Sequence, residues 1–205
     1  MISSKIKMSR YCYKDTDILI NNYKVFDRDL LNRIERDITD LKLTELQIKP
    51  VKGSFNLTHF KAIHKFIFGD IYPFAGKIRR EDIFKGATMF AKYYLVNDGL
   101  KKLFSELAVE NHLKEICAEK LPRRLAHYMA ELNMLHPFCE GNGRAIREFI
   151  RELALGCGYE VNWYVLDKSQ LLTAMKASAI FGNESLERLL KTALVRDEYA
   201  MQEAK

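Results

Sequence analysis

Twelve residues, from His136 to Arg147, bring together side chains that could handle a phosphate group. An imidazole takes up a proton near neutral pH, and the carboxylate of Glu140 could hold Mg²⁺ through oxygen. The Gly141–Gly143 turn allows backbone N–H groups to converge on an anion. Arg144 and Arg147 carry forked donors for phosphate oxygens. These residue types in this order predict a phosphate site.

The residues behind this motif predict an amphipathic helix that starts at the turn. Apolar residues stand at positions 145, 146, 149, 150 and 153, so the positive end of the helix would face the turn. Arg144 and Arg147 are then on one helical face. Each residue alone has an ordinary explanation, as a core histidine, a surface turn or a solvated arginine. Their combination directly ahead of such a helix favours the functional interpretation.

The stretch from His136 to Arg147 resembles the signature of the Fic family, His-Pro-Phe-x-Asp/Glu-Gly-Asn-Gly-Arg-x-x-Arg, and matches it at every defined position. Residues 63–79 resemble the helix and turn that precede the active site in that family, with Phe74 where many members carry Trp. The likeness extends over residues 10 to 195. It implies a mainly α fold, a Fic-type helical bundle with a short β-hairpin flap over the active site. It also implies transfer of a nucleoside monophosphate, usually AMP from ATP, to a Ser, Thr or Tyr hydroxyl of a target protein.

This chemistry gives the first half of the motif distinct roles. We expect His136 to be the general base, because an imidazole with a pKa of about 6.5 is partly neutral at physiological pH. We expect Glu140 to ligate a Mg²⁺ ion that bridges the phosphates of ATP. Pro137 and Phe138 are expected to be structural, with Phe138 packed in the core so that it fixes the loop.

The second half of the motif should bind the triphosphate. The backbone of Gly141, Asn142 and Gly143 and the Asn142 amide should cradle oxygens of the α- and β-phosphates. By resemblance, Arg144 reaches the β-phosphate and Arg147 the γ-phosphate.

Other reactions stay open at this stage. A kinase-like relative of the fold transfers the γ-phosphate, but its turn departs from Gly-Asn-Gly and places Lys before Arg, so Gly143 argues against it. Transfer of UMP or phosphocholine remains an alternative, because recognition of the base is not legible in the sequence. The non-enzyme alternative is a helical binding module that retains a catalytically inactive site.

Residues 79–94 predict a β-hairpin, because aromatic residues stand on either side of a glycine turn at Gly86. In the family that the chain resembles, a hairpin flap holds the target segment by main-chain pairing, which supplies hydrogen bonds without demanding a particular sequence. The alternative is a hairpin that merely covers the core. The expected target-docking residues are Lys85, Gly86, Ala87, Thr88, Met89 and Phe90.

Length and composition indicate one domain, or one domain with a helical attachment. The 205 residues are 48% hydrophobic and 29% charged, which is typical of a soluble globule. The net charge of +6 comes from Lys and Arg scattered among acids, with no long basic run. Solvated helix faces explain this charge better than direct nucleic-acid binding does.

The cysteines and the apolar runs bear on the compartment. Cys12, Cys117, Cys139 and Cys157 lie far apart, and the five histidines include no pair at zinc spacing, so neither a disulfide framework nor a zinc site is indicated. No apolar run is long enough for a membrane span, and no signal peptide follows Met1. We therefore expect a cytoplasmic protein without membrane contact, and delivery by a dedicated secretion apparatus stays open.

The apolar spacing predicts the remaining elements. Residues 1–25 read as an irregular N-terminal arm, and residues 26–205 as the Fic domain with its C-terminal helices. Asp27 and Asn56 are expected to cap the first two helices. The further helices are expected over residues 95–112, 122–135, 167–180 and 184–199.

The regulation follows from a missing pattern. Many Fic proteins carry an inhibitory helix with Ser/Thr-x-x-x-Glu-Gly/Asn, whose Glu pairs with the second motif arginine. No Ser or Thr of this chain has Glu four positions later. The resemblance then implies a toxin that a small separate antitoxin silences by placing a Glu against Arg147. Some related toxins modify type II topoisomerase subunits, which makes such a subunit the first target to test.

Overall fold

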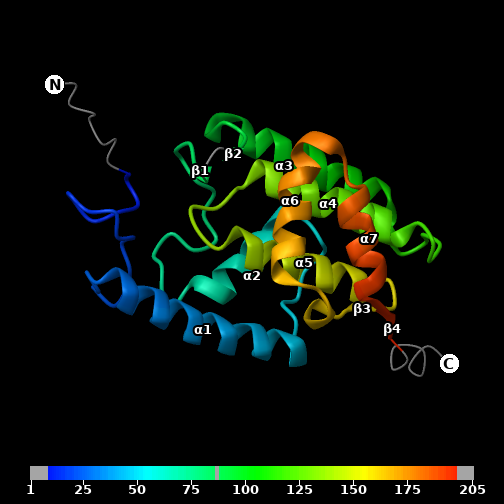
Figure 1. Ribbon diagram of the computed structural model, residues 1–205, viewed down its shortest axis with the longest axis horizontal. Helices are drawn as coiled ribbons and strands as arrows, with labels where there is room; N and C mark the ends of the chain where they lie inside the picture. The colour runs from blue at the N-terminus through cyan, green and yellow to red at the C-terminus, as the bar shows by residue number, and fades with distance from the viewer. Residues whose placement is uncertain (1–8, 86–87, 198–205) are drawn as a thin grey trace.

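The computed structural model describes residues 9–85 and 88–197, and within them the fold is mainly helical, as predicted (Figure 1). The α-helices are α1 (Arg28–Ile48), α2 (Leu57–Phe68), α3 (Tyr93–Val109), α4 (Leu121–Leu135), α5 (Asn142–Leu155), α6 (Lys168–Phe181) and α7 (Glu184–Ala193). The strands are β1 (Phe84–Lys85), β2 (Thr88–Met89), β3 (Tyr159–Val161) and β4 (Leu194–Arg196), and short 3₁₀ turns cover Asn111–Leu113 and Trp163–Val165.

Helix α5 lies at the centre of the molecule, with α1 and α2 on one side and α3 and α4 on the other (Figure 1). Its buried residue Phe149 meets Phe60 of α2 with ring centroids 5.4 Å apart, and Phe60 meets Phe138 at 5.1 Å. All three rings are fully buried. The loop that carries the motif is therefore anchored in the main core through Phe138.

Helix α5 also carries buried charges that fix its position. The guanidinium of Arg151 lies 2.6 Å from the Glu148 carboxylate and donates to the Leu46 carbonyl oxygen at 3.0 Å. The Glu152 carboxylate lies 3.0 Å from Nε2 of His59 on α2. Buried charges are stable only when they are paired in this way. These contacts hold α5 rigidly against α1 and α2.

The predicted caps of the first two helices are confirmed. The Asp27 carboxylate accepts from the Leu30 N–H at 2.7 Å, and the Asn56 side chain accepts from the His59 N–H at 2.9 Å. Each contact satisfies a backbone donor that has no partner within the helix.

Two helix ends differ from the prediction. Helix α3 ends at Val109, because the residues from Asn111 to Leu113 have positive φ values between 49° and 65°. Helix α7 ends at Ala193 instead of continuing to residue 199, and β4 pairs antiparallel with β3. The pairing Val161↔Leu194 follows a turn at Gly158, whose φ of 80° suits glycine. The sequence prediction contained no such sheet.

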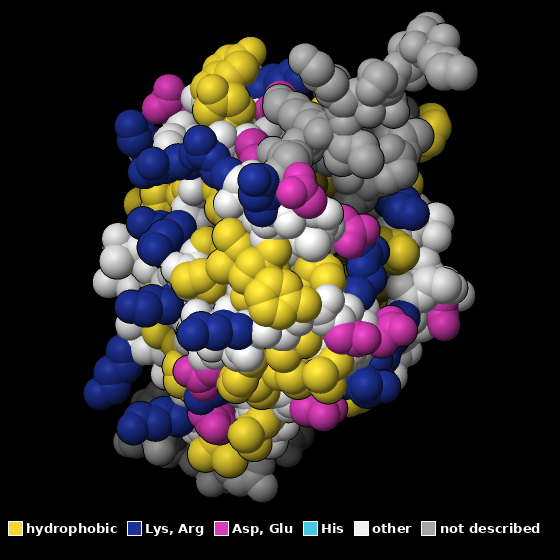
Figure 2. Space-filling model, turned by 90° about the vertical axis from the view of Figure 1, so that its left-hand side faces the viewer, with side chains coloured by type: hydrophobic (Ala, Val, Ile, Leu, Met, Phe, Trp, Pro, Cys, Tyr) yellow, Lys and Arg dark blue, Asp and Glu magenta, His cyan; other side chains and the backbone are white. Residues whose placement is uncertain are grey.

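The described part of the N-terminal segment, residues 9–25, packs on the helices without forming a helix of its own. The Tyr11 ring meets the edge of the buried Phe74 ring at 5.2 Å, and an isolated bridge joins Cys12 to Leu19. Figure 2 shows the face on which this segment and the first turns of α1 lie, with hydrophobic side chains gathered at its centre among lysines and arginines. Phe26 is 62% exposed and packs against the Tyr13 ring. The division between an arm and a domain stays a prediction.

Among the helices of the described residues, none is both long and apolar enough to cross a membrane.

Candidate active site

The motif forms a loop that joins the C-terminus of α4 to the N-terminus of α5. His136, directly after α4, adopts a left-handed conformation with φ 43° and ψ 60°, and its N–H donates to the Leu132 carbonyl oxygen at 3.0 Å. Gly141, directly before α5, has φ 78°. A Cβ there would lie 2.2 Å from the Phe68 ring, so only glycine fits. The two left-handed residues reverse the chain and place His136 close to the start of α5.

One hydrogen bond of the His136 imidazole favours one tautomer. Nδ1 lies 3.3 Å from the carbonyl oxygen of Asn133. A carbonyl oxygen can only accept, so Nδ1 carries the proton of the neutral ring and Nε2 carries the lone pair that a general base needs. The Phe90 ring stacks on the imidazole with centroids 3.7 Å apart and an interplanar angle of 17°. The ring plane is thus held from one side.

His136, Gly143 and Arg147 line one cavity of about 510 Å³. Most of the remaining wall is apolar, and Lys168 and Lys176 add positive charge to it. A cavity of this size with a few polar groups suits a ligand with a flat apolar part and an anionic part. The apolar wall includes Met129, Trp163, Leu166, Leu171, Leu172 and Met175.

Arg147 is the motif arginine that belongs to this cavity. Within residues 9–85 and 88–197 it makes no ion pair, although its side chain is half-buried. Burial, followed by the nearby charge of Arg144, lowers the pKa of its guanidinium. An arginine stays protonated despite such shifts. A partly buried cation of this kind favours an anionic ligand.

Arg144 occupies a different environment. Its Nη2 lies 2.5 Å from the Glu35 carboxylate, and its Nη1 donates to the Thr39 hydroxyl at 3.0 Å, both on α1. The guanidinium also covers the Phe68 ring at 4.7 Å. Tyr72 donates to the same Glu35 carboxylate, and burial together with this hydrogen bond raises the pKa of Tyr72. The structure therefore brings Arg147, and not Arg144, to the cavity wall.

Asn142 differs from the expectation that its amide would bind phosphate. Its side chain is buried, its oxygen accepts from the Phe138 N–H at 2.9 Å, and its NH₂ group donates to the Phe138 carbonyl oxygen at 2.8 Å. Both polar groups of the amide thus hold the loop closed. The phosphate contact that remains to this residue is its backbone N–H at the start of α5.

Glu140 does not line the cavity of His136. Its Oε1 accepts from the Gly141 N–H at 2.8 Å, and the residue lines a second cavity of about 410 Å³ together with Glu35 and Tyr72. No group of three or more metal-binding side chains occurs among the residues that the structure describes. One carboxylate nevertheless fits Mg²⁺, which commonly takes one or two carboxylates plus phosphate oxygens and water.

His64 on α2 is a residue of this site that sequence reasoning missed. The Gly76 N–H donates to its Nδ1 at 2.9 Å, so Nε2 carries the proton and donates to the Glu140 carbonyl oxygen at 2.8 Å. Its ring also stacks on Phe138 at 3.8 Å. Burial lowers the pKa of His64 to about 4, so the ring is neutral. The only sequence signal was a polar residue on an apolar helix face.

The predicted hairpin is present beside the loop. Phe84 pairs with Met89 and Lys85 with Thr88, whereas Gly86 and Ala87 lie outside the described residues. Phe90 follows β2 and stacks on His136, so its side chain does not belong to the docking edge as expected. The hairpin thus adjoins the catalytic loop through Phe90.

Cys139, at the variable position of the motif, is no nucleophile. Burial raises the pKa of its thiol, and the adjacent Glu140 carboxylate raises it further. Only a thiolate is reactive.

This arrangement, with a histidine base after one helix and a glycine turn at the start of the next, agrees with the similarity of this chain to known proteins. The model of the Fic/DOC family matches residues 54–154, and the chain belongs to this family. The chain is 37% identical over 186 residues to the protein adenylyltransferase VbhT of Bartonella schoenbuchensis. The matched residues make up 91% of this chain and 38% of VbhT. The chain thus spans well under half of that relative.

A second relative is matched over most of both chains. The probable protein adenylyltransferase Fic of Escherichia coli is 32% identical over 171 residues, which make up 83% of this chain and 84% of the relative. Among solved structures, the BepC protein of Bartonella tribocorum with bound AMPPNP superposes with a TM-score of 0.84 at 23% identity, covering 91% of this chain and 96% of BepC. At this identity, the likeness to BepC supports the fold alone.

Proposed function

We propose that this chain is a protein adenylyltransferase, which transfers AMP from ATP to a hydroxyl of a target protein. The observation that carries the proposal is that His136, Gly143 and Arg147 line one cavity with an apolar wall. A base, a helix N-terminus and a cation then surround the space that a triphosphate would fill, and the apolar wall leaves room for a nucleobase. The relatives named protein adenylyltransferase support the same reaction.

The chemistry follows from these positions. Nε2 of His136 takes the proton of the target hydroxyl while the hydroxyl oxygen forms a bond to the α-phosphorus. The bond from the α-phosphorus to the bridging oxygen breaks, and pyrophosphate leaves with the electron pair. Base catalysis of this kind typically contributes about 10² to 10⁴-fold. The backbone N–H groups of Asn142 and Gly143 receive the α- and β-phosphate oxygens, and the Gly141 N–H does so only when it leaves the Glu140 carboxylate.

The two arginines have unequal parts in this proposal. Arg147 binds the γ-phosphate directly, since it already lines the cavity. Arg144 binds the β-phosphate only when its guanidinium exchanges the Glu35 carboxylate for a phosphate oxygen. Glu140 would hold Mg²⁺, which neutralises charge on the phosphates when it is bound.

The hairpin docks the target segment in this proposal. Main-chain groups of Lys85 and of the residues from Thr88 to Phe90 supply the pairing edge, and Gly86 and Ala87 belong to the same edge by sequence. A Met89→Pro variant removes one N–H donor from this edge. It should lose target modification and keep its affinity for ATP, whereas a hairpin that only covers the core would leave transfer intact.

Labelled ATP tests the reaction. With Mg²⁺ and a cell lysate, label in the α-phosphate should enter a protein and label in the γ-phosphate should not, which separates AMP transfer from phosphate transfer. His136→Ala should lower transfer by about 10² to 10⁴-fold and keep ATP binding. Arg147→Ala should weaken ATP binding, with exposed Arg123→Ala as the matched control. Transfer by His136→Ala at the wild-type rate would refute the assignment.

The metal role has its own test. Glu140→Ala should raise the Mg²⁺ concentration needed for half-maximal transfer, because a carboxylate ligand is lost. An unchanged Mg²⁺ titration would show that Glu140 does not hold the ion.

We further propose that the chain is a toxin held inactive by a small antitoxin in the cytoplasm. Support comes from Arg147, which has no carboxylate partner within the described part of the chain. Its guanidinium can donate two parallel hydrogen bonds to a carboxylate of a partner protein. Four free thiols fit a reducing compartment. Expression alone should arrest bacterial growth, and purification from the native host should recover a short partner protein. A chain that transfers AMP but is harmless when expressed alone would refute the toxin proposal without touching the reaction.

The target itself is found by identifying the protein that the labelled ATP marks in lysate. A type II topoisomerase subunit is the first candidate to add in purified form.

A further inference from the structure

Arg79, between α2 and the hairpin, is a buried cation that the reaction described above does not use. Its side chain is 2% exposed, and within the described residues it forms no ion pair. Among the residues that the structure describes, its guanidinium donates only to main-chain carbonyl oxygens. These belong to His136 at 2.7 Å, Glu81 at 2.7 Å, Leu135 at 3.2 Å and Ala91.

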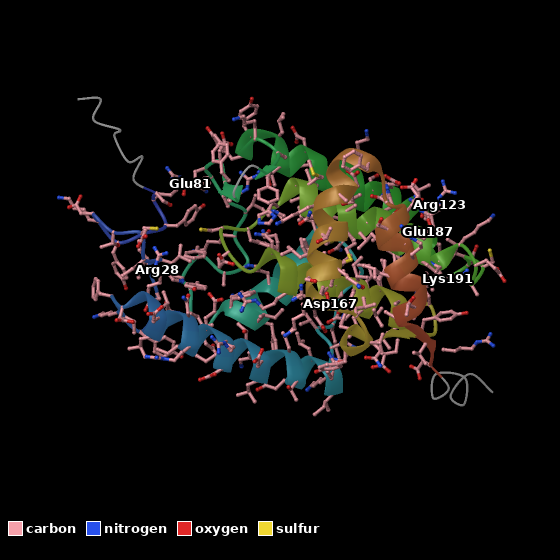
Figure 3. The ribbon with its side chains drawn as sticks, in the orientation of Figure 1. Arg28, Glu81, Arg123, Asp167, Glu187 and Lys191 are labelled. Atoms are coloured by element: carbon pink, nitrogen blue, oxygen red, sulfur yellow. The ribbon has the colours of Figure 1, made fainter. Side chains whose placement is uncertain are left out.

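These acceptors come from the two parts of the site that must cooperate. Leu135 and His136 end α4 and begin the catalytic loop, and their carbonyl oxygens lie where a helix leaves acceptors without partners. Glu81 precedes β1 and Ala91 follows β2, so they are the two ends of the hairpin segment. Figure 3 labels Glu81 beside the hairpin. One side chain therefore holds both ends of the hairpin against the catalytic residue.

The backbone strengthens the same connection. The Arg79 N–H donates to the Pro137 carbonyl oxygen at 2.8 Å, and the Ala91 N–H donates to the Met134 carbonyl oxygen at 3.0 Å. Between these contacts, the ring of Phe90 stacks on the His136 imidazole at 3.7 Å. A shift of the hairpin base would move Phe90, and with it the plane of the imidazole.

We propose that Arg79 is a positioning residue that sets the geometry between the hairpin and the His136 imidazole. The inference rests on the proposed transfer to a docked hydroxyl, because alignment of base and target matters only in that step. Arginine is required because its planar fork reaches carbonyl groups in several directions at once, which the compact ammonium of lysine does not do. The residue touches no substrate and acts through the residues it holds.

The first test separates alignment from binding. Arg79→Lys keeps the charge, and Arg79→Met keeps the length without donors. Arg79→Lys should lower kcat for target modification by about 100-fold, as expected for a small misplacement of reacting groups, with an unchanged KM for ATP. Arg80→Lys is the matched control, since Arg80 is the adjacent, exposed arginine. Equal losses in the Arg79 and Arg80 variants would overturn the proposal.

The second test does not depend on activity. Nitrogen-15 spectra of the imidazoles report the tautomer and the titration of His136, which is assigned among the five histidines by its absence in His136→Gln. In folded Arg79→Lys, the His136 titration midpoint and the amide signals of the hairpin strands should both move. Unchanged His136 and hairpin signals would overturn the proposal and leave Arg79 a purely structural residue, even if Arg79→Met fails to fold.

The two proposals fail in different ways. If the wild-type chain transfers no AMP but the His136 signals move in Arg79→Lys, the proposed function fails and the positioning role stands. If transfer occurs and Arg79→Lys retains the wild-type kcat, the positioning role fails alone.

Discussion

The neutral state of His64 should make the stability of this protein fall steeply in mild acid. Its two ring nitrogens bond to the Gly76 N–H and the Glu140 carbonyl oxygen, and burial lowers its pKa from 6.5 to about 4. A protonated ring would lose the Gly76 contact, because a protonated Nδ1 cannot accept. Protonation therefore weakens the turn at Gly76, whereas Nε2 can still donate to the Glu140 carbonyl oxygen.

Proton linkage gives the sign and the size of the pH effect on the free energy of unfolding. The folded state binds this proton less tightly than the unfolded state, so the stabilisation is complete above pH 6.5 and is lost as the pH falls toward 4. One pKa unit corresponds to about 1.4 kcal/mol, so the stability lost through His64, relative to neutral pH, is about 2 kcal/mol at pH 5 and about 3 kcal/mol at pH 4. These values are of the order of a fifth to a half of the stability of an ordinary domain.

Urea unfolding of wild type and His64→Gln at pH 7 and pH 5 measures this contribution. Glutamine does not titrate, so other ionising groups cancel in the double difference. We expect the advantage of wild type over His64→Gln to shrink by about 2 kcal/mol between pH 7 and pH 5. Lys65→Gln, at the exposed neighbouring position, should show no such change. A constant difference between wild type and His64→Gln would refute the neutral, buried assignment.

Two further substitutions test the loop and the first motif arginine. Gly141→Ala should destabilise the fold by about 2 to 4 kcal/mol in urea unfolding, since it combines a left-handed backbone with a collision against Phe68. Gly158→Ala is the matched control, because its φ is similar and no atom lies within 4 Å of the new Cβ. It should cost only about 1 kcal/mol in the same assay. Glu35→Gln should free Arg144 from its carboxylate partner and tighten ATP binding severalfold in calorimetry, and an unchanged Kd would show that Arg144 does not reach the nucleotide.

The helices and the loop were readable from the sequence because their signals are local. The cap at Asp27 and the helix expected over residues 122–135 depend on residues a few positions apart, and the structure confirms both. The end of α7 was not readable, since it depends on a strand more than 30 residues earlier in the chain. Leu194 pairs with Val161, so the chain leaves α7 after Ala193.

The residues missed at the site share a physical reason. Arg79 and His64 bond mainly to backbone groups of residues that are distant in the chain, such as the carbonyl oxygens of His136 and Glu140. Every residue type carries a backbone carbonyl, so no sequence pattern indicates which one a buried side chain will contact. Two adjacent arginines after a glycine turn look alike in the sequence, and only the fold shows that Arg79 is buried while Arg80 is exposed.

The different environments of the two motif arginines could not be predicted from the sequence either. By sequence, Arg144 and Arg147 are equivalent cations one helical turn apart, and both were assigned to the triphosphate. Their difference arises from α1, because Glu35 of α1 pairs with Arg144, whereas Arg147 has no carboxylate partner within the described residues. An inhibitory carboxylate supplied in trans would therefore act on Arg147, whereas Arg144 already has a carboxylate partner within the chain. Control of nucleotide binding would then require two separate events, the departure of a partner from Arg147 and the exchange of Glu35 for phosphate at Arg144.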